Sequence, residues 1–143
     1  MEIVFKPDPA QEDVDAVLAP LAEASEKSRP GANVRRISFL LKDPHTGAAA
    51  GGLIGNAIYE WLFINLLAVP ESLRGQGYGA ELMARAESWA REQNLTGMWL
   101  DTFAFQAPEF YAKLGFTPFG TINDHPAGSR RIFFQKRFAP HTA

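Results

Sequence analysis

Cysteine is absent from this 143-residue sequence, which excludes disulfides, thiolate metal sites and a cysteine nucleophile. An excess of charge of one sign is also lacking, because 14 lysines and arginines are balanced by 16 aspartates and glutamates. A nucleic-acid-binding protein normally carries a basic face or stripe, and a formal net charge of −2 therefore predicts no nucleic-acid partner. The three histidines, His45, His125 and His141, are scattered along the chain, so we expect no metal site.

Long hydrophobic runs are missing as well. The longest, WLFINLLAV at residues 61–69, is too short to span a bilayer and is interrupted by Asn65. The first residues, MEIVFKPDPAQED, show neither a basic start nor an apolar run, so we expect no signal peptide. Together these absences predict a cytoplasmic protein with no membrane partner.

The remaining features favour one α+β domain over residues 1–143. The length and a hydrophobic content of 46% suit a single core, and no internal repeat or linker divides the sequence. A first helix is expected to be capped by Asp8 and kinked or ended by Pro20, a second to follow the glycines at residues 75–79, and a third to cover residues 107–114. Residues 139–143 are expected to form a frayed tail. Apolar patterning predicts strands at residues 2–6, 34–42, 48–59, 60–69, 98–105, 116–122 and 130–138.

Three glycines at alternate positions, Gly75, Gly77 and Gly79, stand directly before the second helix in the stretch SLRGQGYGAELM. Without side chains, a loop backbone can approach an anion closely, and the N–H groups of the loop and of the helix N-terminus then point at that anion. Phosphate or pyrophosphate is the expected guest. A Walker A loop is excluded because no Gly-Lys-Ser/Thr follows.

One alternative is a dinucleotide-binding fold. The stretch GQGYGA satisfies the fingerprint G-x-G-x-x-G/A, and Asp101 lies about 20 residues downstream, where a ribose-binding acid is expected. The context disfavours this alternative, because PESLR separates the glycines from the preceding strand. The 42 residues after Asp101 are also too few for a second βαβ half.

A second motif favours another enzyme class. The stretch QAPEFYAKLGFTPFG, residues 106–120, resembles the motif Ala-x-x-Phe/Leu-Tyr-x-Lys-x-Gly-Phe of the GNAT superfamily of N-acetyltransferases. The stretch VPESLRGQGYGAELM, residues 69–83, resembles the acyl-CoA-binding motif of that superfamily, and the resemblance covers almost the whole chain. The matching residues in the two motifs are Arg74, Gly77, Gly79, Ala107, Phe110, Tyr111, Lys113, Gly115 and Phe116.

The resemblance implies the GNAT fold, which is a mixed, mostly antiparallel central sheet with one splayed strand pair, flanked by helices. The strand that ends near Val69 would diverge from the strand over residues 98–105, and the pantetheine arm of acetyl-CoA, the co-substrate, would lie in the opening. Backbone groups of Leu67 and Val69 would bond this arm. The loop amides that would hold the pyrophosphate belong to Arg74, Gly75, Gln76, Gly77, Tyr78, Gly79 and Ala80, and Gln106 and Ala107 complete the expected cofactor-binding set.

The resemblance also implies an N-acetyltransferase mechanism in a ternary complex. A primary amine would attack the thioester directly, a backbone amide on the splayed strand would stabilise the oxyanion, and Tyr111 would protonate the leaving thiolate. The alternative for Tyr111 is a core aromatic whose hydroxyl has a backbone partner. No metal or acyl-enzyme intermediate is implied, in agreement with the absence of cysteine.

Two positions depart from the family pattern. An asparagine often stands seven residues before the motif tyrosine, but this chain has Ala104 there, and Gln106 is the candidate replacement. A glutamate often stands on the central strand six residues before the valine, and that position is Phe63.

A general base is still required, because a free amine of ordinary pKa is mostly ammonium at neutral pH. The remaining candidates are Glu60, Asp101 and Glu109. Asp101, near the end of a buried strand, is the predicted catalytic partner of Tyr111. A structural role for Asp101, such as pairing with an arginine, stays open.

The acceptor is not determined by the sequence. The loops SEKSRPGAN and INDHPAGSRR are expected to build its pocket, and neither is strongly acidic. A small-molecule amine, an amino-acid-like metabolite, and a protein N-terminus or lysine all fit, and a homodimer is compatible with the family. The alternative function is a non-catalytic sensor or partner module that binds acyl-CoA.

Overall fold

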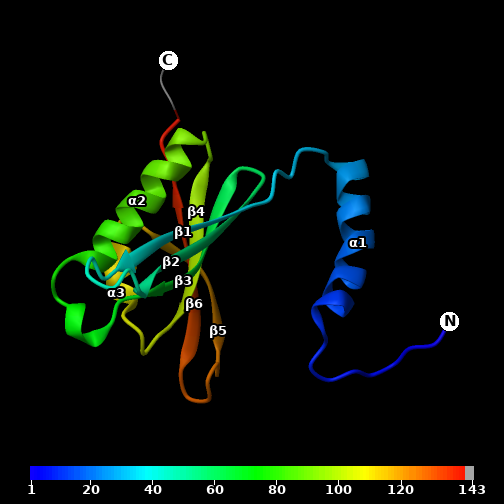
Figure 1. Cartoon of the computed structure of the whole chain (residues 1–143), viewed down its shortest axis with the longest axis horizontal. Coiled ribbons are helices and arrows are strands. Elements are labelled where there is room, and N and C mark those ends of the chain that lie inside the picture. Colours follow the sequence, from blue (N-terminus) through cyan, green and yellow to red (C-terminus); the bar gives the residue numbers. More distant parts are fainter. Residues whose placement is uncertain (141–143) are drawn as a thin grey trace. The chain divides into compact units, whose positions relative to one another are not determined.

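A computed structural model describes residues 1–140 of the chain. It contains two compact units, Met1–Ala32 and the remainder from Asn33, and each is described by itself (Figure 1). The single domain expected over the whole chain stays a prediction. The last three residues of the expected tail, which begin with His141, lie outside the described residues. No helix within residues 1–140 has the length and apolar character needed to cross a membrane.

The first unit contains one helix, α1, over Gln11–Ser28. It begins later than predicted: Ala10 is the N-cap, and its N–H donates to the carboxylate of Asp13 at 2.8 Å. Pro20 lies inside α1 and does not end it. A proline removes only one intrahelical hydrogen bond, and the helix around it supplies the others.

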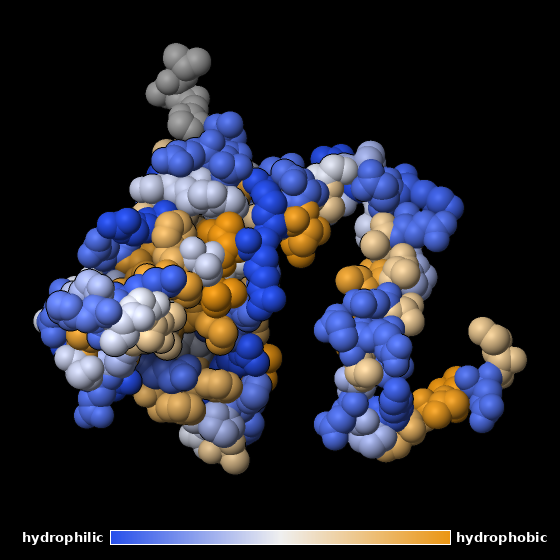
Figure 2. Space-filling model, in the orientation of Figure 1, coloured by the Kyte–Doolittle hydropathy of each residue, from blue (hydrophilic) through white to orange (hydrophobic). Residues whose placement is uncertain are grey.

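The predicted strand at residues 2–6 is not formed, and residues 1–10 contain no helix or strand. A strand needs a partner to receive its backbone hydrogen bonds, and the only regular element in this unit is a helix. One stripe of α1 is apolar at helical spacing, and no residue of the unit buries it (Figure 2). The stripe consists of Val14, Val17, Leu18 and Leu21.

The second unit is built on one six-stranded sheet with the order β1-β2-β3-β4-β6-β5 (Figure 1). Four of the five neighbouring pairs are antiparallel, and β3 and β4 are parallel. The predicted class, a mixed and mostly antiparallel sheet flanked by helices, is confirmed. In chain order the elements are β1 (Arg35–Lys42), β2 (Ala49–Ile58), β3 (Trp61–Ala68), a 3-10 turn (Glu71–Leu73), α2 (Tyr78–Glu92), β4 (Gly97–Phe103), α3 (Pro108–Lys113), β5 (Thr117–Asn123) and β6 (Arg130–Arg137).

The core lies between α2 and one face of the sheet. Alternate residues of the central strands point to this face, as the period of two in a strand requires. The same alternation directs Trp99, Asp101 and Phe103 of β4 to the opposite face. The buried core includes Leu53, Ala57, Leu62, Ile64, Leu82, Met83, Ala86, Ala90, Met98, Leu100, Ile132 and Phe134.

The parallel pair is incomplete. β3 and β4 pair only from Trp61 to Phe63, opposite Gly97 to Trp99. Beyond that point β3 carries one extra residue, because Ile64 and Leu66 face consecutive residues of β2 and Asn65 between them has no partner. A β-bulge of this kind bends a strand. The two strands therefore diverge at Asn65, and the predicted splayed pair is confirmed.

Gly97, on β4, is closely packed between the neighbouring strands β3 and β6, which leads to a stability prediction. A Cβ atom at Gly97 would lie 2.5 Å from the carbonyl oxygen of Lys136 and 2.6 Å from the ring of Trp61. We expect Gly97→Ala to lower the free energy of unfolding by about 1–3 kcal/mol, measured by chemical denaturation. Gly120→Ala on β5 is the matched control, since nothing lies within 4 Å of its Cβ position. Equal stability of the two variants would contradict the prediction.

Candidate functional site

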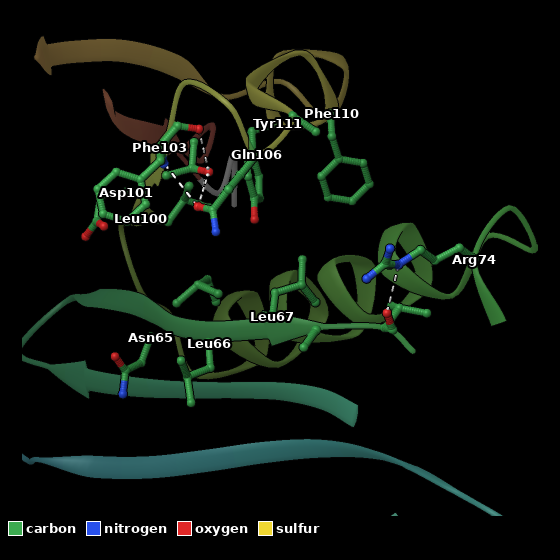
Figure 3. A pocket seen from close by; sticks show the side chains of 16 residues that line it. Asn65, Leu66, Leu67, Arg74, Leu100, Asp101, Phe103, Gln106, Phe110 and Tyr111 are labelled. Atoms are coloured by element: carbon green, nitrogen blue, oxygen red, sulfur yellow. Dashed lines mark hydrogen bonds between the residues drawn. The ribbon is translucent and has the colours of Figure 1, made fainter. Parts of the chain in front are cut away.

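A cavity of about 630 Å³ opens where β3 and β4 diverge (Figure 3). Its one wall is the chain from Ile64 to Val69, and its other wall is formed by the end of β4, the turn that follows and the start of α3. The wall on β3 has lost β4 as a pairing partner, so this edge of the strand is open to a ligand. The predicted residues Leu67, Val69, Arg74, Gly79, Asp101, Gln106, Ala107 and Tyr111 all line the cavity.

The three glycines have two different roles. Gly75 and Gly77 adopt left-handed backbone conformations, with φ of 78° and 85°, and no atom lies within 4 Å of where their Cβ atoms would be. Gly77 is also the N-cap of α2, so this open stretch leads directly to a helix N-terminus. Gly79 lies in the first turn of α2, and its Cβ position is 3.4 Å from the ring of Phe110. Two glycines therefore shape an open, anion-accepting loop, and the third lets α2 approach α3.

The rest of the glycine loop borders a smaller hollow of about 240 Å³ next to the cavity. Tyr78 and Ala80 line this hollow together with Gly75 and Gly77, whereas Gln76 lines neither space. The side chain of Gln76 instead donates to the carbonyl oxygen of Ser72 at 3.5 Å.

Arg74 joins the glycine loop to the end of the cavity wall. Its Nε donates to the carbonyl oxygen of Val69 at 3.2 Å, which fixes the guanidinium at this end of the opening (Figure 3). The carbonyl of Val69 therefore keeps only its second lone pair for a ligand. A fixed cation beside open loop amides is suited to a phosphate group.

Tyr111, on α3, points its hydroxyl into the cavity (Figure 3). Its ring is packed edge-on against Phe110 and Phe116 and tilted against Phe134, with ring centroids 5.1, 6.2 and 6.0 Å away. Burial, and then the negative charge of Asp101, raise the pKa of the Tyr111 phenol above its ordinary value. The phenol is therefore held as a proton donor at neutral pH.

Asp101, on β4, forms an ion pair with Arg131 through one of its two carboxylate oxygens. Its Oδ1 atom accepts from Nε of Arg131 at 2.7 Å and lies 2.5 Å from Nη2 of the same guanidinium. The pairing with an arginine that the sequence left open is thus present, and the carboxylate still lines the cavity. Arg131 could not be predicted from the sequence, because it lies 30 residues from Asp101 and only the β4–β6 pairing brings the two together.

Gln106 lies in the turn after β4, and its side chain is oriented by two hydrogen bonds. Its Oε1 atom accepts from the N–H of Phe103 at 3.1 Å and from the hydroxyl of Thr102 at 3.3 Å. The amide NH2 group is left facing the cavity (Figure 3). Ala107, the next residue, has φ of 102°, a conformation that costs energy for a residue with a side chain and that is concentrated at functional sites.

The other two candidate bases are not among the cavity-lining residues. Glu60 lies in the turn between β2 and β3, where its carbonyl oxygen accepts from the N–H of Thr96 at 2.6 Å. Glu109 lies in the first turn of α3. Phe63, at the position of the family glutamate, stacks on Trp99 at a centroid distance of 4.2 Å. Asp101 is thus the one predicted base that lines the cavity among residues 1–140.

The arrangement suits a long, anionic acyl carrier. An open backbone edge can pair with the amides of an extended arm, the glycine loop and Arg74 can receive phosphate groups, and a phenol and a carboxylate face the middle and far end of the opening. Within residues 1–140, no cluster of three His, Asp or Glu side chains is placed to hold a metal ion. The roles of the individual site residues stay predictions.

Comparisons with known proteins agree on one family. The model of the acetyltransferase (GNAT) family matches residues 10–116. A blasticidin-S acetyltransferase from Streptomyces morookaense is 43% identical over 83 residues, and an acetyltransferase from Agrobacterium fabrum is 37% identical over 91 residues. A crystal structure from Agrobacterium tumefaciens, whose protein is described as an acetyltransferase, has a TM-score of 0.91 and 30% identity.

The extent of these similarities differs. The structural match covers 96% of this chain and 100% of the other. The two sequence matches cover 57% and 64% of this chain, and 61% and 66% of the relatives' own lengths.

The open glycine loop predicts that a side chain there strongly weakens cofactor binding. In Gly77→Val the new side chain fills the space above the loop amides, and we expect the affinity for CoA to fall about tenfold or more. The left-handed backbone also costs about 1–2 kcal/mol of stability. Gly128→Val is the matched control, because Gly128 has φ of 77° and equally open surroundings but lies in the β5–β6 loop. Unchanged CoA affinity in a folded Gly77→Val protein would show that the loop is only a turn.

The electrostatic coupling of Asp101 and Tyr111 predicts a spectroscopic shift. We expect the phenol of Tyr111, isolated by ultraviolet difference titration against Tyr111→Phe, to ionise above its ordinary pKa of about 10. Asp101→Asn removes the negative charge, so the titration midpoint of Tyr111 should move to lower pH. The midpoint should stay above the ordinary pKa, because the ring is still partly buried. Glu92→Gln, at the end of α2 away from the glycine loop, is the control. A midpoint that Asp101→Asn does not move would contradict the coupling.

Proposed function

The chain belongs to the acetyltransferase (GNAT) family, and from that premise we propose that it transfers an acetyl group from acetyl-CoA to a primary amine. One observation carries the proposal: an open strand edge, a fixed arginine, a phenol and a carboxylate line a single opening between β3 and β4, and the open glycine loop borders the hollow next to it. Each of these groups matches one need of acetyl transfer from an extended thioester to an amine.

Binding of the co-substrate would use the β3 wall and the glycine loop. Backbone groups of Leu67 and Val69 would bond the pantetheine arm, and the amide of Gln106 would donate to it from the opposite wall. The loop amides from Arg74 to Ala80 would receive the pyrophosphate. Acetyl-CoA, when bound, supplies a thioester whose carbonyl carbon is open to attack by nitrogen.

The chain's own groups would handle two protons. Asp101 would accept a proton from the ammonium form of the acceptor, so that the free amine forms a bond from nitrogen to the carbonyl carbon. The nitrogen still carries two hydrogens after the attack, and it would lose one of them as a proton to solvent. As the carbon–sulfur bond breaks, Tyr111 would donate its proton to the departing sulfur and recover one from solvent, and Asp101 would release its proton to solvent. The balance is one amide, one thiol and one released proton for each ammonium and thioester consumed.

The acceptor is proposed as a small molecule with a primary amine. Similarity to the blasticidin-S acetyltransferase makes that antibiotic the first compound to test, and a protein amine is the second class. The experiment is to follow CoA release from acetyl-CoA across a panel of amines, beside a thermal-shift titration with CoA. Stabilisation by CoA with no release from any amine would favour a non-catalytic acyl-CoA-binding module. Stabilisation by NADH but not by CoA would overturn the proposal.

The proposed acid at Tyr111 leads to a kinetic prediction. Tyr111→Phe removes one hydroxyl and keeps the ring contacts, so thermal stability and CoA affinity should change little. General-acid contributions are about 10²–10⁴-fold, and a thiolate is already a good leaving group, so we expect kcat to fall roughly 10–100-fold. Tyr59→Phe, in the turn between β2 and β3, is the control and should keep full turnover.

Two outcomes would contradict the assignment of Tyr111. Full turnover of Tyr111→Phe on a verified acceptor would reduce this residue to a packed aromatic. Loss of both turnover and CoA binding would instead indicate that the hydroxyl is structural.

A further inference from the structure

The acceptor must reach the thioester from one end of the cavity. Arg74 and the glycine loop occupy one end, Tyr111 lies in the middle, and Asp101 and Asn65 lie at the other end (Figure 3). If phosphates fill the first end and the reacting carbonyl lies beside Tyr111, the amine must enter through the opposite end, where Asp101 lies. The surroundings of Asp101 therefore decide which amines are accepted, an inference that rests on the proposed function.

The charge at this end suits one ammonium group. Arg131 donates its hydrogen bond to Oδ1 of Asp101, at 2.7 Å from Nε, and Nη2 lies 2.5 Å from the same oxygen. The second carboxylate oxygen accepts no hydrogen bond from any residue in the part of the chain that is described. Because the Asp101–Arg131 pair is neutral as a whole, it provides one directed acceptor atom and no surplus negative charge for a polycation.

Planar groups surround this pair. The guanidinium of Arg131 lies over the ring of Phe103 at 5.5 Å and over Phe133 at 5.6 Å, and Nη1 is 3.4 Å from Nε2 of His125. The ring of Phe105 is parallel to Phe103 within 4°, with centroids 5.3 Å apart.

The last ring of the stack, that of Phe105, is exposed. The side chain of Phe105 is 67% exposed, although it is a large apolar group in the turn beside the cavity. A flat conjugated group can pack on such a ring with offset-stacked geometry, which a puckered saturated ring cannot match. Asp101 and Phe103 point to the same face of β4, roughly 7 Å apart along the strand, and the ring of Phe105 lies 5.3 Å from that of Phe103. A ligand that bonds Asp101 and packs on Phe105 therefore needs a short spacer between its ammonium and its ring.

We propose that Asp101, Arg131, Phe103 and Phe105 form the acceptor subsite, and that it takes a primary ammonium joined by a short chain to a planar ring. The ammonium bonds the free oxygen of Asp101, and the ring packs on Phe105 at the end of the stack. Arg131 is a positioning residue that orients the carboxylate and supports the stack.

The test compares two amines that differ only in ring planarity, 2-phenylethylamine and 2-cyclohexylethylamine. We expect kcat/KM to favour the aromatic amine by about 3–10-fold, the range that aromatic stacking supports. Phe105→Leu keeps an apolar side chain without a planar face, and it should bring the ratio to about 1 while the KM for acetyl-CoA stays constant. Phe39 on β1 provides the control, because it is half-buried against the core beside α2, and Phe39→Leu should keep the preference.

Each outcome decides the proposal. No preference in the unsubstituted protein, a preference that survives Phe105→Leu, or an equal loss in Phe39→Leu would overturn the subsite while acetyl transfer stands. Absence of CoA release from both amines and from the rest of the amine panel, with CoA binding intact, would overturn the proposed function, and the subsite with it.

Discussion

The architecture of this chain depends on a pairing that stops early. β3 and β4 run parallel for three residue pairs and then separate, because the extra residue Asn65 bends β3 away at the point where it still pairs with β2. The opening exposes strand backbone in the middle of a sheet, where backbone groups normally have partners. An extended ligand with its own amides can satisfy those groups, so the break in the sheet itself provides a binding surface. Gly55 faces the bulge, and a Cβ atom there would lie 3.0 Å from Leu62 and 3.2 Å from the carbonyl oxygen of Phe63.

The charged and polar groups of the opening orient one another or shift one another's pKa. Arg131 holds the carboxylate of Asp101, the charge of Asp101 helps to raise the pKa of Tyr111, and the buried ring of Tyr111 is fixed by Phe116 and Phe134. A phenol that stays protonated beside a charged carboxylate is the combination that proton transfer in both directions requires, with one group ready to donate and the other ready to accept. The same electrostatic contact thus serves two steps of the proposed reaction.

Much of the fold and of the cofactor end could be predicted from sequence, because the signals there are local. The strands of the second unit follow apolar patterns of period two, and the glycine loop and the α3 motif are contiguous stretches. The prediction of a strand at residues 2–6 was wrong, because apolar alternation in a sequence does not show whether a pairing partner exists. Pro20 was predicted to kink or end the first helix, and the ending was wrong, because α1 continues through Pro20 to Ser28. The contact of Gly79 with Phe110 could not be predicted, because the sequence does not define the distance between two helices.

The acceptor end depends on strand register rather than on motifs. β4 and β6 pair so that Phe103 faces Arg131 and Asp101 faces Phe133, which brings all four side chains to the face of the sheet opposite α2. A slip of one residue would turn Arg131 toward the core and leave the carboxylate of Asp101 without its cation. The buried neighbours Ile132 and Phe134 hold the register by filling the core on the other face. Packing on one side of the sheet thereby sets the chemistry on the other, and residues in the β5–β6 hairpin can change the acceptor subsite without touching the loop that would hold the phosphates.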